Sequence, residues 1–160
     1  MVKNSKNLLI KLILLISIIA LISAFFIEYI LGHQPCNLCI LERIPYFLAI
    51  IVILLNYKFI EFEKFFILFL TIIFLFGTAL SLYHLGIEQG LIQESLVCDL
   101  KSGSNLLSKE EILKQLQEKS VSCKDVTFKM FGLSLTSYNI LISILITFSA
   151  GKIYFNYDKN

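Results

Sequence analysis

The sequence predicts an all-α fold: an integral membrane four-helix bundle with one long extracytoplasmic loop that carries a short amphipathic helix. Of the 160 residues, 57% are hydrophobic, which exceeds the apolar share of an ordinary soluble domain. Four apolar segments also approach or reach the roughly 20 residues that a helix needs to cross a hydrocarbon core. A chain of this length has room for one domain, so we expect residues 1–160 to form a single membrane domain.

The four expected spans cover residues 12–31, 40–57, 65–85 and 131–151. The first is interrupted only by Glu28 near its end. The second carries Glu42 and Arg43 in its first turn, and it reaches membrane length only if both side chains lie at headgroup depth. An outer loop of about residues 87–130 then connects the third span to the fourth.

A cleaved signal peptide is the alternative interpretation of the first segment. Three lysines among the first eleven residues precede an apolar run that ends near residue 24. The run is long for a signal-peptide core, and three more spans follow, so we prefer an uncleaved first span. In either case Cys36 lies on the far side of the membrane from these lysines.

The orientation of the spans follows from the cysteines. With four spans, both termini and the short link at residues 58–64 share one side, which holds seven lysines against six on the other. The positive-inside rule therefore decides little. All four cysteines lie on the side opposite the termini, and cysteine pairs persist as disulfides outside the cytosol. We expect the termini in the cytoplasm and the cysteines outside it.

The outer loop contains one predicted helix of its own. Ser108-Lys109-Glu110-Glu111 fits a capping box, and Ile112, Leu113 and Leu116 follow as a narrow apolar stripe. A helix of about 12 residues with such a stripe suits a membrane surface or a protein partner. Packing against the loop itself explains the stripe equally well.

The first cysteine pair, Cys36 and Cys39, is predicted to lie at a helix start. Pro35 suits the first helical position, which would put both cysteines in the first turn of the second span. Unpaired N–H groups and the positive end of the helix dipole favour a thiolate there. Pro45 removes one helix hydrogen bond and is expected to loosen the backbone near Leu41.

Arg43 follows Cys39 by four residues and therefore shares its helix face. It is the only arginine in a chain with many lysines, which indicates that its planar set of donors matters as well as its charge. We expect it to stabilise a Cys39 thiolate and to donate to a carbonyl oxygen of a ligand. Contact with lipid phosphates is the alternative.

Structural disulfides and a metal site are the other interpretations of the cysteines. Cys98 and Cys123 are too far apart in sequence for a zinc-finger pattern, and His84 would complete a site only by chance, so we expect no metal. Structural disulfides are more credible. A Cys36–Cys39 bridge, however, closes a very small loop that constrains the unfolded chain little and exchanges easily, which favours electron transfer.

Residues 35–43, with the sequence PCNLCILER, resemble the signature of the disulfide bond formation protein B (DsbB) family. Residues 83–89 at the end of the third span are similar to a segment common in that family. Residues 123–126, 131–135 and 138–139 are similar to its sequence at the start of the fourth span. The resemblance therefore extends over nearly the whole chain.

Two departures accompany the resemblance. Thr127-Phe128 stands where the family frequently has Pro-Trp, and Leu135 stands where Met is common. Neither change removes a reactive group, although both alter the packing expected for the loop.

The resemblance implies a protein-dithiol:quinone oxidoreductase of the bacterial cytoplasmic (inner) membrane, with periplasmic cysteines, that supports disulfide bond formation. A reduced thioredoxin-like (DsbA-like) protein would attack the Cys98–Cys123 disulfide, with Cys98 forming the mixed disulfide. Cys123 would pass the electrons to Cys36, and Cys39 would face a quinone, either ubiquinone or menaquinone. Membrane lipid is the other expected partner, and no nucleic acid is implied.

The resemblance also assigns the two quinone-binding candidates. Arg43 would hold a quinone oxygen, and His84 would lie near the quinone head as a hydrogen-bond donor. The alternative for His84 is an ordinary polar residue at the membrane interface. Glu42 and Gln89 are weaker candidates, because polar side chains at an interface need no special reason.

Three rival classes are less consistent with the sequence. The vitamin K epoxide reductase type resembles this chain in chemistry, but there the CxxC belongs to the last span and the loop pair follows the first. A four-span protein whose cysteines only brace its outer loop is the second rival. A small transporter is the third; it is disfavoured because only the ends of the first two spans carry charge, and buried ionisable residues usually mark a translocation path.

Overall fold

Four apolar helical segments long enough to cross a membrane make up most of the structure. The computed structural model describes residues 2–93, 98, 122–124, 128–130 and 132–157. Within them the candidate spans are Lys6–Tyr29, Asn37–Lys58, Ile60–Glu88 and Leu135–Phe155. This result confirms the predicted class of four-helix membrane bundle.

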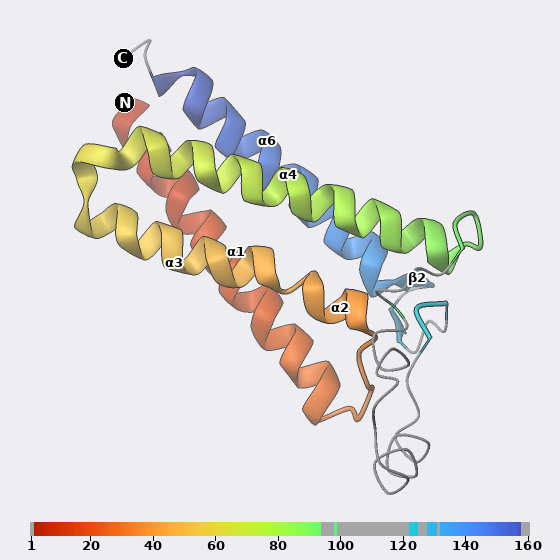
Figure 1. Ribbon diagram of the computed structural model, residues 1–160. Helices are drawn as coiled ribbons and strands as arrows, with labels where there is room; N and C mark the ends of the chain where they lie inside the picture. The colour runs from red at the N-terminus through yellow and green to blue at the C-terminus, as the bar shows by residue number, and fades with distance from the viewer. Residues whose placement is uncertain (1, 94–97, 99–121, 125–127, 131, 158–160) are drawn as a thin grey trace, which may run out of the picture.

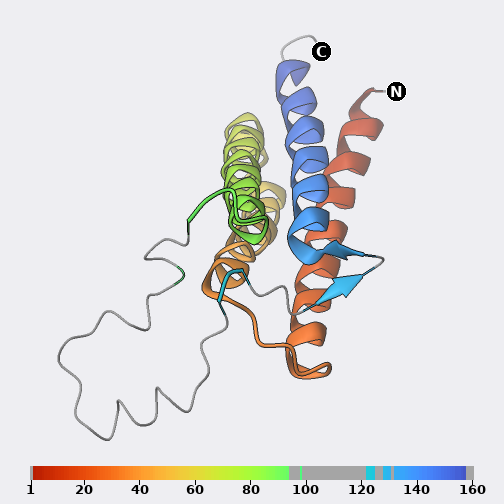
Figure 2. The ribbon, with the colours of Figure 1, turned by 90° about the vertical axis from the view of Figure 1, so that its right-hand side faces the viewer.

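The elements follow one another along the chain as helices with one small hairpin. The helices are α1 (Val2–Tyr29), α2 (Asn37–Leu41), α3 (Ile44–Lys58), the 3₁₀ turn η1 (Ile60–Phe62), α4 (Glu63–Glu88) and α6 (Leu135–Phe155). The strands β1 (Lys129–Met130) and β2 (Leu133–Ser134) pair antiparallel, with Lys129 opposite Ser134. Figure 2 shows this hairpin at the start of α6. The predicted amphipathic helix at about residues 108–119 lies outside the described residues.

The bundle is held by close packing of α4 along α6, with α3 in contact with both α1 and α4. Both termini lie at one end of it, and α2 lies at the opposite end (Figure 1). Its centre contains fully buried Phe74 together with small residues such as Ala49 and Ala150, which allow helix backbones to approach closely. Large apolar side chains such as Phe76 and Phe148 point outward, as expected of surfaces that face lipid.

Three helix bounds differ from the predicted spans by four residues or more: the start of α1, and the start and the end of α6, which ends at Phe155 rather than at residue 151. α1 begins ten residues before the expected span, because the apolar run marks the part suited to lipid and the helix continues through the polar residues before it. α6 begins at Leu135, four residues after the expected start. Gly132, with φ +83°, forms the turn of the hairpin, and the Ser134 side chain caps the helix by accepting a hydrogen bond from Ser137 N.

The second span is broken between α2 and α3, near the residue that the sequence predicted. Pro45 lies in the first turn of α3 and has no N–H to donate to Leu41, so the regular ladder is interrupted there. Glu42 N still donates to Leu38 O at 2.9 Å, and Phe47 N donates to Arg43 O at 3.1 Å. At the break, the Glu42 side chain points toward α4 and the Arg43 side chain points toward α1.

The tight crossing of α4 over α3 predicts the effect of adding a methyl group at Gly77. A Cβ there would lie 3.1 Å from Pro45 Cγ, and the proline ring has no rotamer that moves it away. We expect Gly77→Ala to lower the free energy of unfolding in detergent by about 1–3 kcal/mol through overpacking, measured as a lower thermal midpoint.

Gly151→Ala is the matched control. A Cβ at position 151 would lie 3.8 Å from Thr71 Cγ2, an ordinary contact, so its midpoint should not fall. Equal midpoints for the two variants would contradict close packing at the α3–α4 crossing.

Candidate active site

The Cys36–Cys39 pair lies at the beginning of α2. Cys36 is the N-cap residue: its Sγ accepts a hydrogen bond from Cys39 N at 3.2 Å. The two Sγ atoms lie 2.8 Å apart, and the pair is in the dithiol form. Pro35 was predicted at the first helical position, but α2 begins two residues later, at Asn37, because the Cys36 side chain supplies the cap. Cys39 lies in the first turn as predicted, and Cys36 lies just before it.

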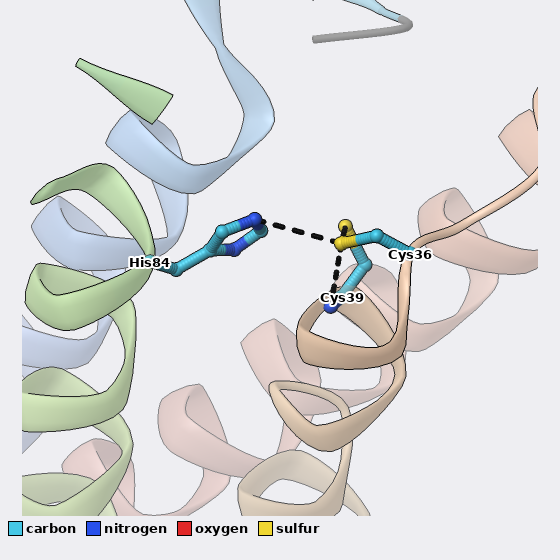
Figure 3. Close-up of side chains that lie close together, drawn as sticks. All are labelled: Cys36, Cys39 and His84. Carbon is cyan, nitrogen blue, oxygen red and sulfur yellow. Dashed lines mark hydrogen bonds between the residues drawn. The ribbon is translucent and has the colours of Figure 1, made fainter. Parts of the chain in front are cut away.

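His84 approaches this pair from α4 (Figure 3). Its Nε2 lies 3.5 Å from Cys36 Sγ, and its Nδ1 lies 2.9 Å from Glu42 Oε1. Its side chain is 2% exposed. An Nδ1–H that donates to the Glu42 carboxylate leaves Nε2 to exchange a proton with Cys36.

Glu42 connects His84 to a buried polar network. Its Oε2 accepts a hydrogen bond from Asn139 Nδ2 at 2.9 Å, and the same amide group donates to Ser81 Oγ at 2.8 Å. Tyr46 OH donates to Asn139 Oδ1. The network joins the α2–α3 break to α4 and α6, and each member has a partner, as a polar group in a low-dielectric interior requires.

The expectation that buried ionisable residues are absent was wrong. Glu42 is 8% exposed and His84 is 2% exposed. Both stand near the ends of apolar segments, where hydropathy alone suggests contact with water or headgroups. At the helix break Glu42 points into the bundle, where His84 partners it. The bundle therefore does contain buried ionisable side chains, which the spans were expected to lack.

The environment of Cys36 favours its thiolate. The hydrogen bond with the Cys39 thiol lowers the pKa of Cys36, burial opposes this, and the hydrogen bond and charge of His84 lower it further, to about 5. The sequence analysis expected the thiolate at Cys39, next to Arg43. In this reduced pair the strongest stabilisation of a thiolate is found at Cys36.

The second cysteine pair lies against the first. Cys98 and Cys123 form a disulfide with a Cα–Cα distance of 6.0 Å. Cys123 is buried in one cluster with Cys36, Leu38 and Ile87, and Cys98 packs against that cluster. Asn37 Nδ2 also donates to Cys98 O at 3.2 Å. All four cysteines are thus brought together at one end of the bundle.

A cavity of about 370 Å³ opens beside Cys39. Most of its walls come from α1, the α2–α3 break and α6, and they are mostly apolar, with Glu28, Glu42, Arg43 and Asn139 among the polar residues. This size and character are typical of sites for small organic ligands.

Arg43 is held at the cavity wall. Its guanidinium forms an ion pair with Glu28 of α1 and lies 5.2 Å from the centre of the Phe25 ring. Its side chain is only 18% exposed, so most of its contacts are with protein groups. A side chain that only reached lipid phosphates would be more exposed. His84 is not among the residues that line this cavity, because it lies beside Cys36.

Sequence reasoning underestimated Glu42 and did not single out Glu28 or Asn139. One feature of the sequence could have identified all three residues: each is polar and lies in an apolar span, where such residues usually face the bundle interior. Gln89, named with Glu42 as a weaker candidate, is exposed at the end of α4.

Comparison with known proteins gives the family. The sequence model of the family "Disulfide bond formation protein DsbB" matches residues 6–152. The chain belongs to the DsbB family. It is also 33% identical, over 165 aligned residues covering 99% of this chain and 94% of the other, to the uncharacterized protein RP370 of Rickettsia prowazekii (strain Madrid E). No solved structure matches the chain.

Membership of the DsbB family makes this chain a multi-pass membrane oxidoreductase that acts as a thiol oxidase in disulfide bond formation. Its family match covers both cysteine pairs, Arg43 and His84. The family is associated in general terms with quinones.

The position of His84 predicts the reactivity of Cys36. Because the imidazole helps to lower the pKa of Cys36, most of the reduced Cys36 should be thiolate at pH 7, above the pKa of about 5. We expect His84→Ala to slow alkylation of Cys36 by iodoacetamide at pH 7, measured by mass spectrometry of the reduced protein.

His33→Ala removes the other histidine, which contacts Phe128. The alkylation rate of Cys36 in this control should match that of the unchanged protein. Equal rates for the His84→Ala and His33→Ala variants would contradict the role of His84.

Proposed function

We propose that this DsbB family member is a quinone-coupled thiol oxidase that reoxidises a periplasmic thioredoxin-like protein. One observation carries the proposal: the Cys98–Cys123 disulfide and the Cys36–Cys39 pair lie in one cluster, and Cys39 also lines an apolar cavity with Arg43. An apolar cavity with a fixed cation suits a lipid-soluble acceptor with carbonyl oxygens.

Disulfide exchange connects the partner to the membrane pair. A thiolate of the reduced partner attacks Cys98, and the partner leaves as a disulfide while Cys98 and Cys123 become thiols. Cys123 then attacks the Cys36–Cys39 disulfide at Cys36 and releases Cys39 as a thiolate. Cys98 attacks the Cys36–Cys123 mixed disulfide at Cys123, which regenerates the Cys98–Cys123 disulfide and leaves Cys36 and Cys39 reduced.

This order of steps gives each member of the first pair its own task. Cys36 is buried beside Cys123, which suits exchange between the pairs. Cys39 lines the cavity and is a free thiolate while Cys36 is held in the mixed disulfide with Cys123. Once Cys98 has released Cys36, formation of the Cys36–Cys39 disulfide from the two thiols would give up two electrons and two protons to an acceptor in the cavity. The Cys39 thiolate expected from the sequence belongs to the mixed-disulfide state, and the Cys36 thiolate belongs to the fully reduced pair.

The cavity fits a quinone ring, with Arg43 as the residue that would hold one of its oxygens. When bound, a quinone, whether ubiquinone or menaquinone, supplies the capacity to take up two electrons and two protons. The protein supplies position and charge. His84, 3.5 Å from Cys36 Sγ and held by Glu42, takes the thiol proton, so its proposed task is at the sulfur atom.

The location of the sites supports the proposed topology. α2, which Cys36 caps and which contains Cys39, lies at the end of the bundle opposite both termini (Figure 1), as cytoplasmic termini and periplasmic cysteines require. Cys98 and Cys123 belong to the same cluster as this pair.

The deciding experiment measures quinone reduction by the purified protein in detergent, with a reduced thioredoxin-like protein as donor. The unchanged protein should catalyse the reaction, and Cys36→Ser or Cys98→Ser should return it to the uncatalysed rate. Cys123→Ser should also stop turnover while quinone still binds, because only the link between the pairs is lost. Full turnover in any of these variants would overturn the proposed relay.

Arg43→Lys tests the quinone site. The charge is kept, but the planar donor set is lost, so we expect the KM for quinone to rise by about tenfold, the equivalent of about 1.4 kcal/mol. The matched control is Lys58→Arg at the other end of α3, which should leave the KM unchanged. An unchanged KM in Arg43→Lys would mean that Arg43 does not bind quinone.

A further inference from the structure

We propose that the reduced Cys36–Cys39 pair and His84 form a zinc-binding site, and that Zn²⁺ bound there blocks oxidation of the pair. One ligand atom from each of these three residues lies within 4.8 Å of the other two. Two thiolates and one imidazole form a donor set that zinc prefers. From the sequence we expected no metal, because Cys98 and Cys123 are far apart and His84 would complete a site only by chance. The fold brings His84 from α4 to the first pair.

A tetrahedral ion requires the Cys39 side chain to move, because its Sγ lies 2.8 Å from Cys36 Sγ and within 4.8 Å of a ring nitrogen of His84. Zinc bonds of about 2.3 Å to sulfur and about 2.0 Å to nitrogen place neighbouring ligand atoms about 3.5 to 3.8 Å apart. His84 Nε2 and Cys36 Sγ already lie at 3.5 Å. The two Sγ atoms, at 2.8 Å, must separate by about 1 Å, and Cys39 has room for this because its side chain borders the cavity.

The partners of His84 are those of a metal-binding histidine. Glu42 Oε1 lies 2.9 Å from Nδ1, which sets the proton on Nδ1 and leaves the Nε2 lone pair directed at Cys36. A carboxylate that holds the second ring nitrogen is the usual outer-shell arrangement of zinc sites. Asn139 Nδ2, 2.9 Å from Glu42 Oε2, fixes that carboxylate in turn.

A fourth ligand is available from the same helix as His84. Glu88 Oε1 lies 3.8 Å from His84 Nε2, and the Glu88 side chain is 9% exposed. Thr136 holds this carboxylate through a hydrogen bond to the same oxygen. Three ligands are therefore almost in place, and a fourth lies close enough to close the coordination shell by a side-chain rotation.

Zinc binding and electron transfer exclude each other at this pair. Zn²⁺ takes up no electrons, so it binds the two thiolates with release of their protons and leaves the sulfur atoms reduced. Formation of the Cys36–Cys39 disulfide removes two of the ligands. Only the reduced enzyme should bind the ion, and the ion should hold it in that state. Zinc binding here depends on the two thiols and His84, and not on the proposed quinone reaction.

Zinc affinity can be measured without any enzymatic turnover. The full-length Cys98→Ser/Cys123→Ser protein, whose only thiols are Cys36 and Cys39, is reduced in detergent and titrated with Zn²⁺ against a chromophoric chelator. We expect one ion per chain. Co²⁺ in place of Zn²⁺ should give the visible absorption of a tetrahedral thiolate site. After oxidation of the pair, both signals should disappear.

Histidine variants identify the third ligand. In the same background, His84→Ala should weaken zinc binding by at least about 100-fold, and Glu42→Gln by about 10- to 100-fold through loss of the outer-shell carboxylate. His33→Ala should bind as tightly as the background protein. Retained helical circular dichroism in each variant shows that the loss is local.

Two results would overturn the zinc site: no stoichiometric binding to the reduced protein, or equal affinity in the His84→Ala and His33→Ala variants. Binding that persists after oxidation would place the ion elsewhere. A protein that binds zinc but does not reduce quinone would refute the proposed function and leave this inference standing, and the opposite result would do the reverse.

Discussion

The hydrogen bond between Glu42 and His84 is the interaction on which the site depends. It joins the break in the second span to α4, and it lies in a region where an unpaired carboxylate or imidazolium would be costly. Without it the imidazole would have no fixed tautomer, and burial of the Glu42 carboxylate would lack the hydrogen bond from His84 that offsets its cost. The position of Cys36 relative to His84 follows from this contact, because α2 and Glu42 belong to the same continuous stretch of chain.

Two neighbouring charges at the helix break have different partners. Consecutive residues of a helix are about 100° apart, so neighbouring side chains point in different directions even in a regular helix. Here Glu42 faces His84 and Asn139, and Arg43 faces the cavity and Glu28 of α1. Each charge has an opposite partner, so both can remain at this depth.

The sequence predicted much of the fold. The four long apolar runs predicted the four helices, and the positions of the cysteines outside these runs predicted that they gather at one end of the bundle. The loosened backbone near Leu41 also followed from the chemistry of one proline. The position of Glu42 did not, since hydropathy places a charged residue at a span end in water or among headgroups. Asn139 and Glu28 were missed for a related reason: their partners are distant in sequence, and the three-dimensional contacts alone give them a role. The start of α6 moved because a glycine turn and a serine cap outweighed the apolar character of residues 131–134.

The ion pair between Glu28 and Arg43 limits the affinity of the cavity for a ligand that hydrogen-bonds to Arg43. A guest oxygen that takes a donor from the guanidinium competes with a carboxylate already bound to it. Part of the favourable free energy of the new hydrogen bond is therefore offset, because the ion pair is weakened at the same time. Short residence times follow. If the cavity binds a quinone as proposed, this competition would favour release of the reduced product into the bilayer, because tighter binding would slow its departure.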